Sequence, residues 1–442
     1  MRLLTVVFVA VVFVALVLGA SITSTLGPAS KITVTAGASS GEEQYVLVGG
    51  QNGTWFRAGQ APRLYELSLS DYSVEPLVPV SSQGTVWTGG WNGSQWLISG
   101  WGRVPGPHGS NPYIYLYDGQ NQIVAGTMNQ SQSESSWRGG DIFAASYNGT
   151  EWLLSGLGSG VLTSYDPKAT TNHMSLATFD GYKFTDLSNI VPEQRDAILY
   201  ANAWNGRTWL VGGGYHHEGV LFLFNGSGFM DLTPEIEKAV RTFASVQCLA
   251  WNGEFWLIGG IGFLAKYDGS RFADLTAELT GALNPSVSVT VNAVSWNGSM
   301  WMLGGGTPVA QLQASKAWAA TFTSTRFTDI SSELGSYGSD VISPSSILTI
   351  TSKNDSWIIG GYLKTQGTLY AYLGGSFINL SNLVSGFSYV DWVGAGTQYD
   401  RSSPVLTGLS TSRFLRMIDA SNPIKKILAF LGKIGEVAVR GA

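Results

Sequence analysis

The stretch VQCLAWNGEFWLIGGIGFLAKYDGSRFADLTAEL, residues 246–279, decides the fold because its pattern recurs along the chain. It contains an apolar run, Asn-Gly, a second apolar run ending in Gly-Gly, a third run before Asp-Gly, and a fourth run. Asn-Gly between apolar runs is a strong hairpin signal, because Gly adopts the positive φ that tight turns need. The segment therefore predicts four short antiparallel strands, with the third over 263–267 and the fourth over 271–275.

Related segments recur about every 50 residues, at 88–100, 144–156, 202–213, 293–305 and 351–361, with a degenerate first copy at 38–50 and a weaker last copy at 393–408. Four antiparallel strands per repeat predict an all-β fold, a β-propeller of seven or eight four-stranded antiparallel blades. The two counts stay open: residues 413–418 could supply a third strand for the last copy, but no fourth is evident.

Two recurring features are expected to serve the repeat itself. A two-residue turn at Asn92-Gly93 would pair Trp91 with Ser94 and make Trp91 and Trp96 diagonal neighbours. Because such Trp residues recur, we expect them to pack between blades rather than to stack on sugars. The motif F-x-D-[LI] is expected to close each fourth strand by a hydrogen bond; its acidic residues are Asp186, Asp231, Asp274 and Asp329.

The pattern resembles kelch repeats, which carry an apolar strand, a tight turn, four apolar residues, Gly-Gly, a Tyr and a later aromatic residue. Here these are residues 255–258, Gly259-Gly260, Tyr267 and Phe272. The family's second aromatic residue is usually Trp, which Phe replaces in this chain. The resemblance covers about residues 31–418 and implies a propeller that acts as a binding module, as a structural part or occasionally as an oxidase.

The ends of the chain differ from its middle. Residues 1–20, MRLLTVVFVAVVFVALVLGA, predict a secretory signal peptide or a retained N-terminal membrane anchor, and residues 21–30 a linker to the propeller. Residues 419–442 predict a linker and a short amphipathic C-terminal helix. This helix either docks on the propeller or binds a membrane surface or partner. The chain is thus expected at the cell surface or outside the cell.

Asn-x-Ser/Thr motifs accompany this expectation of export. They begin at Asn52, Asn92, Asn129, Asn148, Asn225, Asn297, Asn354 and Asn379. Asn-Gly turns followed by Ser or Thr also create such motifs by accident, so glycosylation and turn chemistry are both open explanations.

Composition excludes several classes of function. The net charge of −5 and the pI near 5.4 argue against a nucleic-acid partner, which would need a basic face. A single Cys excludes a disulfide scaffold and a Cys-based metal cluster. Cys248 lies in an apolar run and is expected in the core, which argues against a copper-radical oxidase. We expect no metal and no cofactor.

In a propeller, the connections between strands two and three lie on the side opposite the Asn-Gly turns. These connections vary in length here, and all four His residues lie in them. Loops on rigid scaffolds usually carry recognition, although ordinary surface loops would look the same. The candidate binding residues are Trp55, Trp101, Arg103, His108, His173, Tyr215, His216, His217 and Glu218.

No catalytic residue is predicted, because no repeated spacing selects a pair of carboxylates, a cluster of Arg, a nucleophile elbow or a phosphate loop. An enzymatic role is left open but is not the first expectation. The first expectation is an exported, non-enzymatic propeller that binds a protein or glycan partner through its strand 2–3 loops. The alternatives are a carbohydrate-active propeller enzyme and a structural subunit of the cell envelope.

Overall fold

The computed structural model describes most of residues 45–395 and two short strands before them. The described ranges are 21–22, 34–35, 45–52, 61–77, 84–102, 111–119, 122–127, 140–159, 172–191, 197–215, 218–283, 288–309, 314–338, 345–353, 356–364 and 366–395. The chain divides into two compact units: residues 43–399, and residues 1–42 together with 400–442. In the second of these, β1 (Ser21–Ile22) pairs with β2 (Val34–Thr35) in antiparallel register. The leader, the C-terminal helix and residues 413–418 lie outside the described residues.

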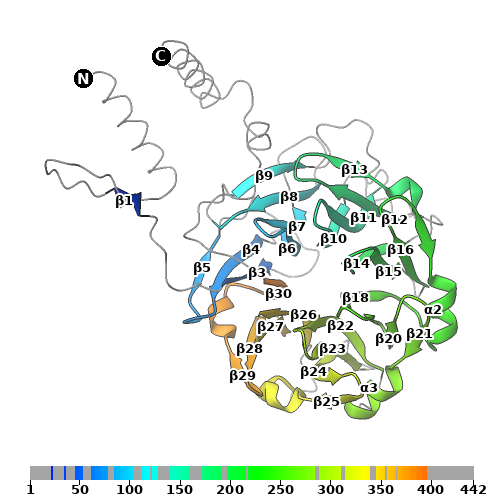
Figure 1. Ribbon diagram of the computed structural model, residues 1–442. Coiled ribbons are helices and arrows are strands. Elements are labelled where there is room, and N and C mark those ends of the chain that lie inside the picture. Colours follow the sequence, from blue (N-terminus) through cyan, green and yellow to red (C-terminus); the bar gives the residue numbers. More distant parts are fainter. Residues whose placement is uncertain are drawn as a thin grey trace, which may run out of the picture. The chain divides into compact units, whose positions relative to one another are not determined.

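Residues 43–399 form seven four-stranded antiparallel blades around one axis (Figure 1), which confirms the predicted propeller and gives its blade count. Blade 2 consists of β6 (Gly84–Trp91), β7 (Trp96–Gly102), β8 (Asn111–Tyr117) and β9 (Gln122–Thr127). Blade 3 consists of β10 (Gly140–Tyr147), β11 (Trp152–Ser159), β12 (Asn172–Phe179) and β13 (Phe184–Asp186). Blade 4 consists of β14 (Ile198–Trp204), β15 (Trp209–Tyr215), β16 (Glu218–Phe224) and β17 (Phe229–Asp231). Blade 5 consists of β18 (Val246–Trp251), β19 (Trp256–Gly260), β20 (Phe263–Tyr267) and β21 (Phe272–Asp274). Blade 6 consists of β22 (Thr290–Trp296), β23 (Trp301–Val309), β24 (Ala314–Thr323) and β25 (Arg326–Asp329). Blade 7 consists of β26 (Ser345–Lys353), β27 (Ser356–Leu363), β28 (Gln366–Leu373) and β29 (Ser376–Asn379).

Blade 1 joins the two ends of the repeat. Its order is β30 (Tyr389–Ala395), β3 (Tyr45–Asn52), β4 (Ala61–Ser68) and β5 (Val74–Pro76), so the last strand of the chain pairs with the first strand of the ring. The two incomplete copies at 38–50 and 393–408 therefore contribute to one blade, and the eight-blade alternative is wrong. The first copy is degenerate because it lacks its own innermost strand, which β30 supplies.

The turn between strands one and two differs from the expected two-residue turn. Trp91 pairs with Trp96, not with Ser94, so four residues form the loop. Oδ1 of Asn92 accepts hydrogen bonds from the backbone N–H groups of Ser94 and Gln95 at 2.9 and 2.7 Å. The Asn side chain thus closes the loop itself, and the two indoles become direct rather than diagonal neighbours, with centroids 5.2 Å apart.

Aromatic rings continue this contact across whole blades. In blade 5, Trp251, Trp256, Tyr267 and Phe272 lie in register on four successive strands. Their consecutive centroids are 4.4, 5.7 and 4.3 Å apart. The second Trp of the motif is buried in each of blades 2 to 7, at 1–3% exposure. This confirms that the recurring Trp residues belong to the core.

The Gly-Gly pair has a separate reason at each position. A Cβ on Gly260 would collide with the carbonyl oxygen of Ser245, and the equivalent Gly in all seven blades meets the corresponding carbonyl. A Cβ on Gly259 would lie 2.6 Å from Cγ1 of Val291 in the next blade. One glycine therefore permits an irregular innermost strand, and the other permits close blade-to-blade packing.

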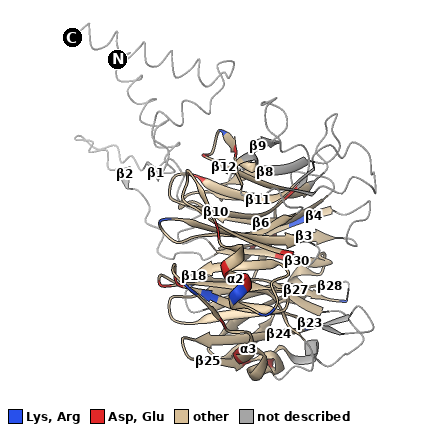
Figure 2. Ribbon diagram, turned by 90° about the vertical axis from the view of Figure 1, so that its right-hand side faces the viewer, with Lys and Arg blue, Asp and Glu red and all other residues tan. Residues whose placement is uncertain are grey.

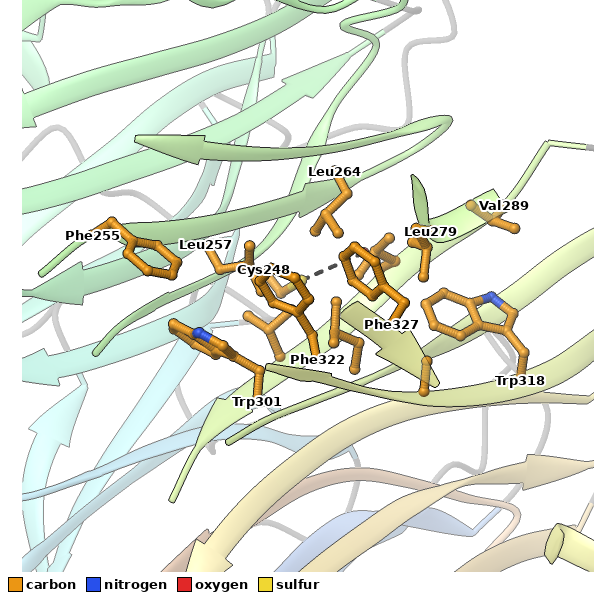
Figure 3. Packing of buried hydrophobic residues seen from close by; sticks show 14 residues of the cluster. Cys248, Phe255, Leu257, Leu264, Leu279, Val289, Trp301, Trp318, Phe322 and Phe327 are labelled. Atoms are coloured by element: carbon orange, nitrogen blue, oxygen red, sulfur yellow. Dashed lines mark hydrogen bonds between the residues drawn. The ribbon is translucent and has the colours of Figure 1, made fainter. Parts of the chain in front are cut away.

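The core lies between adjacent blades rather than within one sheet. Figure 3 shows the cluster between blades 5 and 6, where Leu257 and Leu264 face Trp301 and Phe322. Cys248 is buried here, with Sγ 3.5 Å from the carbonyl oxygen of Val291. Burial raises the pKa of its thiol, which agrees with the expected core role.

Each described fourth strand in blades 3 to 7 ends in the same cap. Asp274 accepts a hydrogen bond from the N–H of Thr276 at 2.9 Å, and Oγ1 of Thr276 accepts one from the N–H of Leu264 at 3.0 Å. The Asp residues of the motif therefore close the strand as expected, and Asn379 does the same in blade 7 through Ser381. The cap begins short helices that the sequence analysis missed: η1 (Ser188–Ile190), α2 (Thr233–Ala239), α3 (Thr276–Leu283), η2 (Ser331–Gly338) and η3 (Ser381–Val384).

Candidate functional site

One residue of every innermost strand bulges out of its sheet. The innermost strands surround the axis in Figure 1, and each shows a register shift against its neighbour. The seven bulged residues, which we call the axial ring, are Trp87, Phe143, Tyr200, Gln247, Asn292, Leu348 and Asp391. All seven are half-buried, so solvent reaches each of them. Bulges commonly re-aim side chains next to functional sites.

Three consecutive members of the axial ring form an aromatic arc. The rings of Trp87 and Phe143 are stacked with centroids 4.6 Å apart, and Phe143 lies 5.3 Å from Tyr200. They come from blades 2, 3 and 4, so contacts this short require the innermost strands to converge near the axis. Partly exposed aromatic rings in contact form an amphipathic surface, which packing of the core does not explain.

The other side of the axial ring carries Gln247, Asn292 and Asp391 together with Leu348, and three of the four N–H groups of its two amides are already bonded. Nδ2 of Asn292 donates to Oγ of Ser346 at 2.9 Å and to the carbonyl of Ile347 at 3.1 Å. Nε2 of Gln247 donates to Oγ of Ser245 at 2.9 Å. Among the described residues, nothing donates to Oδ1 of Asn292 or to Oε1 of Gln247. The amide oxygens of Gln247 and Asn292 are therefore available as acceptors.

Two carboxyl groups lie on these strands, in blades 1 and 3. Oδ2 of Asp391 accepts a hydrogen bond from Oγ1 of Thr85 at 3.1 Å. Asp141 lies two residues before Phe143, and its Oδ1 is buried with no hydrogen-bond partner among the described residues. Burial raises the pKa of each carboxyl to about 7, and for Asp391 the Thr85 bond opposes this only in part. Both groups are held where ionisation is costly.

The axial ring lies toward the side on which the strand 2–3 connections leave the blades. Innermost strands begin, and second strands end, on that side, and the bulge falls within the first four residues of each innermost strand. Trp101 of β7 is half-buried and pairs with Thr85, the residue that binds Asp391. One predicted binding residue thus lies beside the axial ring.

The remaining predicted binding residues are only partly described. Glu218 begins β16 and is exposed, and it pairs with Tyr215 at the end of β15. His173 lies in β12 and pairs with Gly158. Trp55, Arg103, His108, His216 and His217 lie outside the described residues, so their gathering into one site stays a prediction. Among the described residues, no three of His, Cys, Asp and Glu come together as a metal site would require.

The described Asn-x-Ser/Thr motifs lie in turns or at strand ends. Asn92, Asn148 and Asn297 lie between first and second strands, and Asn225 lies between third and fourth strands, all on the side away from the axial ring. Their Oδ1 atoms bind the N–H and hydroxyl of the Ser or Thr two residues later. Turn chemistry alone thus accounts for these motifs. Asn52 ends β3 and Asn379 ends β29, both exposed, while Asn129 and Asn354 lie outside the described residues.

Charge is sparse over the described propeller, as Figure 2 shows. No helix in the described parts of the chain is long and apolar enough to cross a membrane. On the seven innermost strands the charged residues are Asp141, Asp391 and Lys353, and Lys353 ends β26, away from the bulge.

Sequence reasoning missed the axial ring because its members differ in every blade. The sequence signal was positional: each member lies one to three residues after the start of the innermost strand, opposite the Gly-Gly or Ser-Gly pair of the next strand.

No protein-family model and no curated protein matches the chain. A putative 6-phosphogluconolactonase from Bacteroides uniformis is 11% identical with a TM-score of 0.48, over 80% of this chain and 99% of that chain. The β-propeller domain of the Trilobed protease from Pyrococcus furiosus is 9% identical with a TM-score of 0.42, over 88% and 98%. An acylaminoacyl peptidase from Pyrococcus horikoshii is 10% identical with a TM-score of 0.44, over 76% and 50%, so this chain spans about half its length. At these scores the likenesses carry no functional argument, and the fold is established by the strand order.

Proposed function

We propose that this protein is an exported, non-enzymatic binding module that holds its partner at the axial ring and at the strand 2–3 connections around it. The observation that carries this proposal is the axial ring: seven different, half-buried side chains at the equivalent bulge of the seven innermost strands. Repeated residues such as the buried Trp serve the fold. Residues that vary at an equivalent, irregular position are free to serve a ligand.

Export is the second part of the proposal. The apolar leader at 1–20 supports it, and the four Asn-x-Ser/Thr motifs in turns lie on the side away from the axial ring. Glycans at those Asn residues would leave the binding side uncovered. The resemblance to kelch repeats agrees with a binding module. Protease treatment of intact cells should digest the propeller, and protection of the propeller would reject export.

Capture of the partner from a native envelope extract tests the binding site. The full chain serves as bait, alongside Trp87→Ala and Asp391→Asn in the axial ring and alanine substitutions over 101–108 and 215–218. Tyr182→Ala is the matched control, because Tyr182 is exposed in a strand 3–4 turn on the opposite side. Loss of capture in the ring and loop variants alone supports the proposal. Capture that survives both sets rejects it.

A second candidate is a carbohydrate-active enzyme. Asp141 and Asp391 favour it, because a carboxyl whose pKa is about 7 can act as a general acid near neutral pH. Incubation of the full chain with a panel of aryl glycosides distinguishes the two functions. Release of aryl alcohol that disappears in both Asp→Asn variants would replace the binding proposal by the enzymatic one.

A further inference from the structure

The axial ring combines unbonded acceptor oxygens, carboxyl groups and aromatic rings, which favours one class of ligand, and the inference rests on the proposed binding function. Both N–H groups of the Asn292 amide and one of the Gln247 amide are bonded within the protein, whereas Oε1 of Gln247 and Oδ1 of Asn292 accept no hydrogen bond from the described residues. Asp391 adds a carboxylate oxygen beyond the one that Thr85 binds. A complementary ligand therefore brings hydrogen-bond donors to these acceptors.

Asp141 supplies an independent observation. The side chain two residues before a bulge faces the bulged side chain of the preceding blade: Thr85 meets Asp391, and Ser346 meets Asn292. By the same relation Asp141 faces the place of Trp87. Its Oδ1 is buried and unpartnered among the described residues, whereas Thr85 and Ser346 are bonded. A buried acceptor without a donor is costly unless a ligand supplies one.

Charge and aromatic surface narrow the class further. The bulged ends of the seven innermost strands carry two carboxyl groups and, among the described residues, no basic side chain. Beside them lies the half-exposed arc of Trp87, Phe143 and Tyr200, with Trp87 stacked on Phe143 at 4.6 Å. Aromatic faces attract cations, and planar guanidinium groups stack on them. A neutral sugar also stacks on aromatic rings, but it carries no positive charge to balance the two carboxyl groups.

We propose that the axial ring binds an organic cation of the ammonium or guanidinium class, with the carboxylates and amide oxygens as acceptors and the aromatic arc as the stacking surface. Two sources share this chemistry: a free amine or guanidine, and a Lys or Arg side chain that projects from a protein partner. In either case the cation supplies the hydrogen-bond donor that Oδ1 of Asp141 lacks. Its charge also compensates carboxyl groups that are otherwise costly to ionise.

Titration calorimetry at pH 8 with the full chain tests the inference. The probes are arginine methyl ester, a hexa-arginine peptide amide and a hexacitrulline peptide amide, which has nearly the same shape without the charge. We expect the hexa-arginine peptide to bind, either together with the ester or alone. Hexacitrulline should bind at least tenfold more weakly than hexa-arginine. Binding of the ester indicates a free ligand as source, and binding of the peptide alone indicates a partner's side chain.

Variants then locate the site. Asp391→Asn and Asp141→Asn should each weaken arginine binding about tenfold, and Trp87→Ala about fivefold. Asp274→Asn is the matched control, because it removes the same charge at a strand end where Asn379 already does the same capping in blade 7. Equal binding of citrulline and arginine, or equal losses in Asp274→Asn, would overturn the cation class. If no cation binds but partner capture still depends on the axial ring, this inference fails while the proposed function stands.

Discussion

Replacing Asp391 with Asn is expected to stabilise the folded protein at pH 8 and to change its stability little at pH 4. Burial raises the pKa of Asp391 from 3.8 to about 7 in the folded protein. Between these values the unfolded chain is ionised while the folded protein still holds the proton, so the free energy of unfolding of the wild type falls as the pH rises through this window. Above pH 7 the loss is complete and constant.

The magnitude follows from the same values. At 1.36 kcal/mol for each tenfold change, a pKa raised from 3.8 to about 7 corresponds to about 4 kcal/mol. This is an upper limit, because the side chain is partly reached by solvent, and we expect Asp391→Asn to gain about 1–3 kcal/mol at pH 8. The Asn oxygen still accepts the hydrogen bond from Thr85, so the substitution leaves that contact in place.

Urea unfolding followed by Trp fluorescence between pH 4 and pH 9 measures the effect. The difference between Asp391→Asn and wild type should be small at pH 4, grow to about pH 7 and then stay level, and Asp141→Asn should behave alike. Asp274→Asn provides the reference for loss of one carboxylate outside the axial ring. A destabilisation by Asp391→Asn that is the same at pH 4 and pH 8 would refute the reasoning, because the carboxyl would then be a structural partner.

Three further predictions concern the fold and need only stability measurements. Gly260→Ala should lower the free energy of unfolding by more than about 2 kcal/mol or prevent folding, because its Cβ meets backbone. Gly281→Ala in α3 meets nothing within 4 Å and should leave the free energy of unfolding unchanged or raise it by up to about 1 kcal/mol. Similar effects of the two substitutions would contradict the role given to Gly260 at the bulge. Thr276→Val should lower the free energy of unfolding by about 1–3 kcal/mol, because it leaves the N–H of Leu264 unpaired. Thermal unfolding measures this, and an unchanged melting temperature would show that the cap does not stabilise the fold. Deleting residues 388–442 removes β30 and should abolish cooperative unfolding, whereas deleting 400–442 should preserve it; equal behaviour would reject closure of the ring by β30.

The sequence predicted the parts of the fold that repeat. The third strand over 263–267 is observed, and the fourth lies within the range expected for it. The buried Trp and the Asp caps were also anticipated, because a residue that recurs in every copy serves the copy. The ring closure was ambiguous because β30 and β3 are far apart in the chain, and each half of blade 1 looked like a poor copy of a whole one.

The candidate site was less predictable than the fold for a physical reason. A bulge is set by the pairing of two strands, so the positions of Trp87 and Asp391 relative to the axis follow from register and not from either strand alone. The turn at Asn92 shows the same limit, since the Asn side chain closes a four-residue loop that the dipeptide signal assigns to a two-residue one. Cross-blade contacts such as Trp87 with Phe143 join residues that no local pattern connects.

Photocrosslinking from two tyrosine positions tests most directly whether ligands bind at the axial ring. Tyr200 belongs to the aromatic arc, and Tyr182 is exposed in a turn on the opposite side of the blades. Each is replaced in turn by benzoylphenylalanine, and the full chain is irradiated in a native envelope extract. The account predicts a specific crosslinked partner from position 200 and none from position 182. Crosslinking from position 182 alone would contradict it.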